Sequence, residues 1–323
     1  MKRRDLLQII LFGLPVSVSL FPVYSVELSD EIISADVLFK KNEFAQSLEA
    51  YKKIRNKSIN KNFGVEWKYC TLQIIRCSRR LCDLLIASEE YFQYCRVDSL
   101  APLELAPVIW QVSSAFIHGS KPDPQASFNI LRQIANSNSN PAAELLAASI
   151  LAASQENSLR NIGLHHLRKL ANPQDNATEN TNKTDNKNIT NNRLANIKPQ
   201  HAEALKKLTH EVMLLSGVLL WKERIPILRN EKDIAAMRRL LEQVPEVLRA
   251  GAFFLFGKAA AQIGLLEEAV IEIMKIPVQY PEDASLVLDS LTEAAKILDK
   301  LNRKNQAEQL RSEAKELITK CKF

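Results

Sequence analysis

The chain has 323 residues, of which 46% are hydrophobic and 25% are charged, so it can bury a substantial core and does not have the composition of a disordered protein. Its formal net charge of +6 is too small for the strongly basic surface of a nucleic-acid-binding protein. Only 8 glycines are present, and no run of alternating β-branched residues is bounded by turns, so we expect an all-α fold.

Residues 1–25 have the pattern of an export signal. Basic residues at positions 2–4 precede an uncharged run over 6–26, with small residues before a predicted cleavage site near position 25. The sequence RRDLL at 3–7 resembles the twin-arginine export motif in part, and ordinary secretion is the competing route. We therefore predict a periplasmic or cell-envelope protein.

An uncleaved N-terminal segment is the alternative interpretation of the same residues. The uncharged run over 6–26 is nearly long enough to span a bilayer, and it would then associate the protein with a membrane. Gly13, Pro15 and Pro22 interrupt the run and favour a cleaved signal over an anchor.

Helical patterns follow in an N-terminal helical-repeat region over 26–171. Asp123 before Pro124 and Asn140 before Pro141 each place a capping side chain ahead of a first-turn proline, so two helices should begin there. The stretch 141–154 is apolar nearly all round and should be flanked by helices on more than one side. The other expected helices are 29–41, 44–56, 65–81, 83–95, 101–118 and 157–171.

The five cysteines occur without any Cys-x-x-Cys pair, which argues against a zinc knuckle and a thioredoxin-like motif. Cys70 and Cys77 share one helical face, as buried side chains would, and Cys321 ends the last helix. A disulfide between Cys82 and Cys95 is the open alternative in an oxidising compartment.

Residues 172–198 form a predicted linker. Eight of the 21 residues from 172 to 192 are asparagine, and so few are apolar that we expect a disordered segment or a long surface loop. This linker divides the N-terminal region from a C-terminal helical-repeat region over 199–323. The last helix of that region has one apolar and one charged face, which suits the terminal cap of a helical stack.

Small or turn-compatible residues recur three times with the same spacing, a step of seven residues followed by a step of five. Such spacing is typical of two antiparallel helices that cross closely at the outer positions and reverse at the middle one. The three sets are Ala35, Asn42 and Ser47; Gly257, Gly264 and Ala269; and Ala295, Asn302 and Ala307.

This pattern resembles the tetratricopeptide repeat, a unit of two helices and 34 residues. The stretch 253–281 follows the family order most closely, with Pro281 after the second helix, and 35–54 and 295–314 are further copies. The resemblance implies an α-solenoid of stacked antiparallel helical hairpins, with a concave surface that binds proteins or peptides. It also implies that the first helix of each hairpin lines that surface, where Lys258 and Lys296 occupy matching positions and would together recognise a carboxylate. Solvated surface lysines are the alternative for both.

We find no pattern for catalysis, metal binding or a cofactor. The five histidines have no metalloprotease spacing, no glycine-rich phosphate loop occurs, and the acidic pair Glu267 and Glu268 should diverge on a helix surface. Trp67, Trp110 and Trp221 are expected in the core.

The leading hypothesis is thus an exported, non-catalytic interaction scaffold with a protein or peptide partner. The alternatives are an all-α envelope enzyme that acts on polymers through dispersed acidic residues, and a structural component anchored by its N-terminus.

Overall fold

The computed structural model describes residues 30–58, 64–81, 83–98, 124–136, 140–172, 199–281 and 283–321. Within these ranges the elements are helices and no strand occurs, which confirms the expected all-α class there. The export signal, the helix expected over 101–118 and all of the predicted linker except residue 172 lie outside the described residues.

The helices before the linker begin and end within a few residues of their expected positions. Asn140 caps its helix as predicted, because its Oδ1 accepts a hydrogen bond of 2.9 Å from the backbone N–H of Ala142. Asp83 caps another helix through the N–H of Ile86, at 3.2 Å. The elements are α2 (Asp30–Lys40), α3 (Phe44–Ser58), α4 (Val65–Arg80), α5 (Leu84–Val97), α7 (Pro124–Asn136), α8 (Pro141–Ala152) and α9 (Asn157–Ala171).

The helices after the linker include two well-formed hairpins at the end of the chain. The first hairpin closes ahead of Pro281, as its position predicts, because proline cannot continue a helix efficiently. The elements are α12 (Pro199–Leu219), α13 (Trp221–Arg224), η3 (Ile225–Ile227), α14 (Glu231–Gln243), η4 (Glu246–Leu248), α15 (Ala250–Gln262), α16 (Leu266–Gln279), α17 (Ala284–Lys300) and α18 (Lys304–Cys321).

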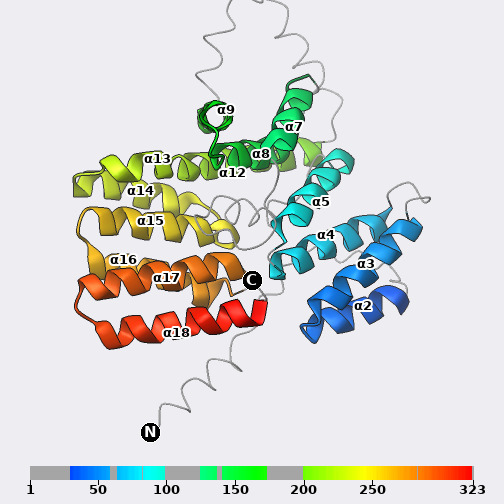
Figure 1. The fold of residues 1–323 in the computed structure, drawn as a ribbon. Coiled ribbons are helices and arrows are strands. Elements are labelled where there is room, and N and C mark those ends of the chain that lie inside the picture. Colours follow the sequence, from blue (N-terminus) through cyan, green and yellow to red (C-terminus); the bar gives the residue numbers. More distant parts are fainter. Residues whose placement is uncertain are drawn as a thin grey trace, which may run out of the picture.

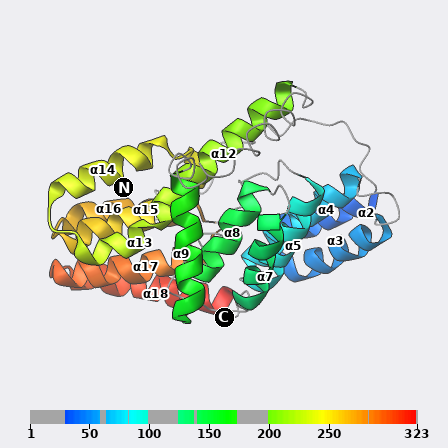
Figure 2. The same cartoon turned by 90° about the horizontal axis from the view of Figure 1, so that it is seen from above.

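The helices pack mainly on their neighbours in the chain. Figure 1 shows α12 and α13 in one row, with the helices from α14 to α18 below it; we call this set, Pro199–Cys321, the C-terminal stack. The helices α2 to α5, Asp30–Val97, form an N-terminal arm beside it, and Figure 2 shows α7, α8 and α9 between the two. The helices α9 and α12 pack together across the predicted linker, so one hydrophobic cluster extends from the arm into the stack.

The three hairpins with the seven-and-five spacing reverse in the same way. Among the described residues, positive φ angles occur only at Asn42 (61°), Gly264 (91°) and Asn302 (59°), the middle positions of the pattern. In each turn the next residue donates its N–H to the carbonyl five positions earlier, as Leu265 does to Ala260 at 3.0 Å. Glycine and asparagine are the residues that adopt this left-handed conformation at least cost, so the prediction of a turn at these positions is confirmed.

The outer positions of the pattern are buried where the two helices cross. Ser47 Oγ donates a hydrogen bond of 3.0 Å to the carbonyl of Ala35, which joins the two outer positions of the first hairpin. In the next hairpin, a Cβ atom added to Gly257 would lie only 2.4 Å from Ile273 Cγ1. A larger side chain at these positions would therefore force the helices apart.

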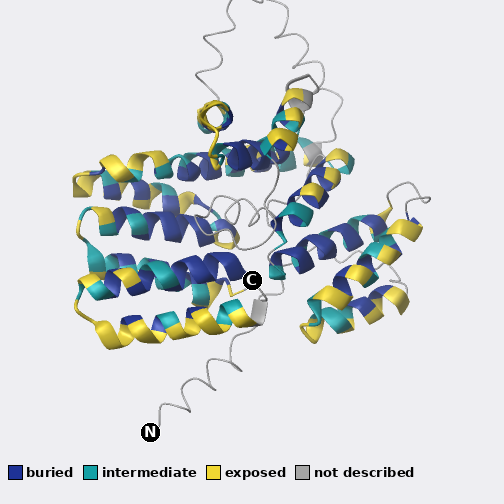
Figure 3. Cartoon of the chain, in the orientation of Figure 1, coloured by how far each residue is buried: buried dark blue, intermediate teal, exposed yellow. Residues whose placement is uncertain are grey.

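The helix α8 is buried on nearly all sides, as its apolar sequence predicts, and it contacts α5, α7, α9 and α12. A Cβ atom on Gly163 of α9 would lie 2.3 Å from the backbone nitrogen of Ala152, so α8 and α9 also cross closely. At the other end of the fold, α18 buries Ala307, Leu310 and Ala314 and is exposed on its outer side (Figure 3). It thus has the two faces expected of a terminal helix.

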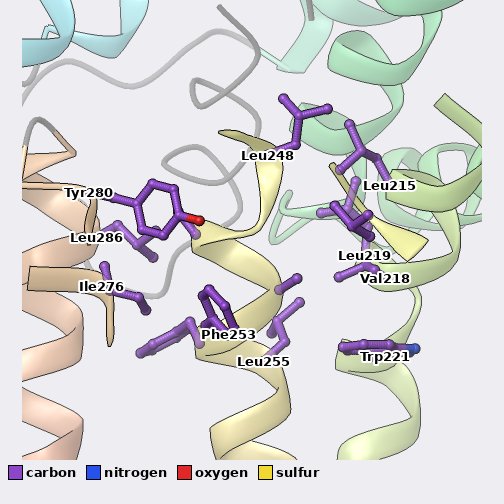
Figure 4. Packing of buried hydrophobic residues seen from close by; sticks show 14 of the residues in the cluster. Leu215, Val218, Leu219, Trp221, Leu248, Phe253, Leu255, Ile276, Tyr280 and Leu286 are labelled. Carbon is purple, nitrogen blue, oxygen red and sulfur yellow. The ribbon is translucent and has the colours of Figure 1, made fainter. Parts of the chain in front are cut away.

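Side chains from successive helices fill the core of the stack. Figure 4 shows Phe253 and Leu255 of α15 between Trp221 of α13 and Ile276 of α16. Trp67 and Trp221 are each 3% exposed and lie in the core as expected, whereas Trp110 lies outside the described residues. None of the helices described is both long and apolar enough to cross a membrane.

Candidate functional site

Lys258, the first predicted binding residue, lies on the face of α15 where a polar group would be least expected. The neighbouring positions from Ala250 to Ala260 are buried, and Lys258 itself is half-buried. Its Nζ lies 5.6 Å from the ring centroid of Phe254, one helical turn earlier. The aromatic ring stabilises the ammonium group by a cation–π interaction.

Lys222 of α13 is a second cation close to Lys258. The pKa of Lys222 is lowered from 10.5 to about 8, chiefly by burial and also by the positive charge of Lys258. The negative charges of Asp289 and Glu223 act in the opposite direction. An ammonium group whose pKa is lowered by burial and by a like charge is a typical feature of a functional site.

Asp289 supplies the acidic group of this site from α17. Its side chain is 0% exposed although it lies in the middle of a helix, with Leu288 and Ser290 buried on either side. The helices α13, α15 and α17 thus bring two lysines and one carboxylate into charge interaction. We call Lys222, Lys258 and Asp289 the lysine–aspartate cluster.

Lys296, the second predicted binding residue, has a different environment. Its side chain is 57% exposed, and its Nζ lies 3.1 Å from Glu293, one turn earlier on α17. Lys258 therefore lies near the like charge of Lys222 from another helix, whereas Lys296 has an acidic partner on its own helix. Sequence spacing paired these two lysines by position in the repeat, and it missed Lys222 and Asp289.

One signal in the sequence was available for Asp289. It is the one charged residue in the segment 284–291, and an aspartate at a core-facing position of a helix requires a partner. No such signal marks Lys222, which follows the buried Trp221 at the end of an apolar run. Only the packing of α13 beside α15 brings it near Lys258.

The positive charges of Lys222 and Lys258 repel each other, and a carboxylate or phosphate placed between them would relieve that repulsion, so an anion is the ligand that suits this cluster. The part of Lys222 that is neutral near pH 8 could also act as a base or nucleophile.

The acidic pair at the start of α16 diverges, as adjacent residues on a helix should. Glu267 accepts a hydrogen bond of 2.5 Å from Arg303, whereas Glu268 accepts one from Arg238 of α14. The two carboxylates thus link α16 to α14 and to the turn between α17 and α18. They do not form a catalytic pair.

The described histidines and thiols provide no metal or redox site. His165 is exposed, and His166 Nδ1 lies 2.9 Å from Glu144 Oε1. Across the described ranges, no group of three His, Cys, Asp or Glu residues could hold a metal ion. Cys95 carries a free thiol and so does not form the disulfide considered with Cys82, a residue outside the described ranges.

Burial disfavours the thiolate forms of Cys70 and Cys77. It raises the pKa of the Cys70 thiol to about 12 and that of Cys77 to about 11. A pocket of about 410 Å³ at the turn between α17 and α18 is lined by residues 302–306, and its Arg303 is already bound to Glu267. The lysine–aspartate cluster is therefore the better candidate site.

Comparisons with known proteins found no match: no protein-family model fits the chain, and the searches of curated proteins and of solved structures found none that matches it. The likeness to the tetratricopeptide repeat thus rests on the residue spacing alone.

Proposed function

We propose that the chain is an exported, non-catalytic scaffold that binds a protein or peptide on the first helices of its stacked hairpins. The observation that carries this proposal is the repetition of one hairpin geometry, with left-handed turns at Asn42, Gly264 and Asn302. A single hairpin cannot bury its apolar face, so copies stack in a tetratricopeptide-like solenoid. Proteins with this architecture bind mostly other proteins through the surface that the first helices line.

The helices α15 and α17 are the first helices of the two C-terminal hairpins. They carry Lys258 and Asp289 of the cluster, and Lys222 is added from α13. We propose that an acidic group of the partner binds between Lys222 and Lys258. Lys296 lies further along α17 and would contact a neighbouring part of the same partner.

The N-terminal sequence supports an envelope location for this binding, because basic residues followed by an uncharged run direct export. Cell fractionation tests this part of the proposal. We expect the mature chain in the periplasmic fraction, whereas recovery with the membranes after a salt wash would support the anchored alternative.

Affinity capture from the native envelope tests the binding proposal. The tagged chain with residues 1–25 removed serves as bait, next to the variants Lys258→Ala and Lys296→Ala and the control Lys304→Ala, an exposed lysine at the start of α18. We expect a protein partner that wild type and Lys304→Ala retain and that Lys258→Ala loses. Equal recovery with all four baits would contradict the proposed binding surface.

The lowered pKa of Lys222 beside the buried Asp289 is the one observation that favours the alternative of an envelope enzyme. Such an enzyme would turn over an envelope polymer, and Lys222→Met would abolish the turnover. A panel of envelope glycans and peptides distinguishes the two functions. The scaffold proposal predicts that wild type converts none of them.

A further inference from the structure

A buried ion pair joins the N-terminal arm to the C-terminal stack. Arg79 in the last turn of α4 bonds through Nη2 to Oδ1 of Asp283, and the two residues are 204 positions apart in the sequence. Their side chains are only 8% and 2% exposed. Figure 1 shows the end of α4 directed toward the beginning of α17, so the arm and the stack meet end to end here.

Asp283 occupies the N-cap position of α17 but does not cap it, because its side chain accepts no hydrogen bond from the first turn of that helix. The other Asp and Asn residues at described N-caps do cap their helices: Asp83 at 3.2 Å, Asn140 at 2.9 Å and Asn230 at 3.2 Å. An aspartate at this position normally gains a hydrogen bond and a favourable interaction with the helix dipole. Asp283 lacks that hydrogen bond and binds Arg79 instead.

Two hydroxyls next to this ion pair are unsatisfied. The hydroxyls of Ser78 and Ser285 are buried, and neither has a hydrogen-bond partner among the described residues. Buried hydroxyls without partners are unfavourable. The ion pair is thus accompanied by an unused cap and two unsatisfied hydroxyls, which lower the net stability of this junction.

We propose that Arg79 and Asp283 form a latch between two arrangements of the arm. In the closed arrangement Asp283 binds Arg79, and in the open arrangement Asp283 turns back to cap α17 while Arg79 becomes hydrated. Because the carboxylate has a partner in both, opening does not leave a buried charge unpaired, which is the usual obstacle to breaking such a pair. The contact between α5 and α8 remains and acts as the hinge.

Opening of the latch would also affect how a partner reaches the binding site, and this part of the inference rests on the proposed function. Asp283 and Asp289 lie on the same helix, so an arm that closes onto the start of α17 approaches the helix that supplies the acidic group of the cluster. We expect the open arrangement to admit a partner to the lysine–aspartate cluster more readily. The closed arrangement would reduce the access of the partner to this cluster.

Single-molecule energy transfer tests the latch without any partner. Dyes placed at the exposed positions Ile33 of α2 and Ile271 of α16 report the distance between arm and stack. The variant Asp283→Asn keeps a side chain that can cap α17 but weakens the bond to Arg79. Asp83→Asn is the matched control, since Asp83 caps α5 in the usual way.

We expect wild type to show a minor population at longer distance, and Asp283→Asn and Arg79→Gln to increase its ratio to the closed form by about tenfold. The control should leave the ratio unchanged. The proposal would be overturned if both latch variants kept native helical content by circular dichroism and showed only the inter-dye distance of the closed form. If either variant failed to fold, the wild-type protein alone would decide: a single inter-dye distance in it would also overturn the proposal.

Affinity measurements with the captured partner keep the two proposals separate. If the arm opens in the latch variants but no partner binds wild type, the proposed function fails and the latch stands. If a partner binds wild type through Lys258 and the distance never changes, the latch fails and the function stands.

Discussion

Replacing Gly257 by alanine tests the close crossing of α15 and α16 on which the hairpin geometry depends. The new Cβ atom would lie 2.4 Å from Ile273 Cγ1 and 3.0 Å from the carbonyl oxygen of Ala269. Ordinary contacts of this kind are 3.4–4 Å, so the two helices must separate or Ile273 must change its rotamer. Ile273 is 0% exposed and has little room to move.

The expected magnitude is a balance of two terms. Overpacking of a well-packed core costs about 1–3 kcal/mol, and replacement of glycine by alanine inside a helix returns about 1 kcal/mol. We therefore expect Gly257→Ala to lower the free energy of unfolding by about 1 kcal/mol.

Gly217→Ala in α12 is the matched control, because it has the same gain in helix propensity and a milder contact. Its Cβ atom would meet only Leu240 Cδ2, a side-chain atom, at 3.2 Å. This variant should be as stable as wild type or more stable by up to about 1 kcal/mol. The difference between the two variants isolates the packing cost, since the propensity term cancels.

Chemical denaturation followed by circular dichroism measures both values, provided that the transition is two-state. The double variant Gly257→Ala, Ile273→Ala sharpens the result, because removal of the Ile273 side chain makes room for the new methyl group. We expect it to be more stable than the sum of the single changes implies, by about 1–2 kcal/mol. If Gly257→Ala were as stable as Gly217→Ala, the helices would not cross as closely as described.

Three further predictions concern turns, charge and thiols. At Asn302, where φ is 59°, alanine should cost about 1 kcal/mol and glycine should be tolerated, as denaturation midpoints would show; equal costs would contradict the left-handed turn. The pKa of Lys222 falls from 10.5 to about 8 on folding, so the unfolded chain binds more protons between these pH values and this lysine makes the free energy of unfolding rise with pH in that window. Lys222→Met should lack that rise, and an identical pH profile in both proteins would refute the lowered pKa. The buried Cys70 and Cys77, with pKa values raised to about 12 and 11, should resist alkylation at pH 8 until denaturant is added, and labelling of the native protein would contradict their burial.

Local features of the fold could be predicted from the sequence because their causes are local. The prolines at 124 and 141 mark helix starts through their neighbours, and the turn positions Asn42, Gly264 and Asn302 are marked by the few residues that tolerate positive φ. Helical periodicity placed most of the remaining helices. These signals need no knowledge of distant contacts.

Contacts between distant segments could not be predicted in this way. At Gly163 the helix α9 crosses α8 closely, but Gly163 does not belong to the seven-and-five pattern. The repeat therefore did not predict this crossing. The ion pair of Arg79 with Asp283 and the approach of Lys222 to Lys258 depend on how the helices are arranged in space. For the same reason, the matching repeat positions of Lys258 and Lys296 did not reveal that their surroundings differ.

The central claim is that a protein partner binds at the lysine–aspartate cluster, and lysine footprinting with the captured partner tests it most directly. An amine-acetylating reagent at pH 8, followed by mass spectrometry, measures the labelling of Lys222 and Lys258 with and without the partner, with the exposed Lys304 as internal reference. We expect the partner to protect Lys222 and Lys258 and to leave the labelling of Lys304 unchanged. Equal labelling of Lys222 and Lys258 in the free and bound protein would contradict it.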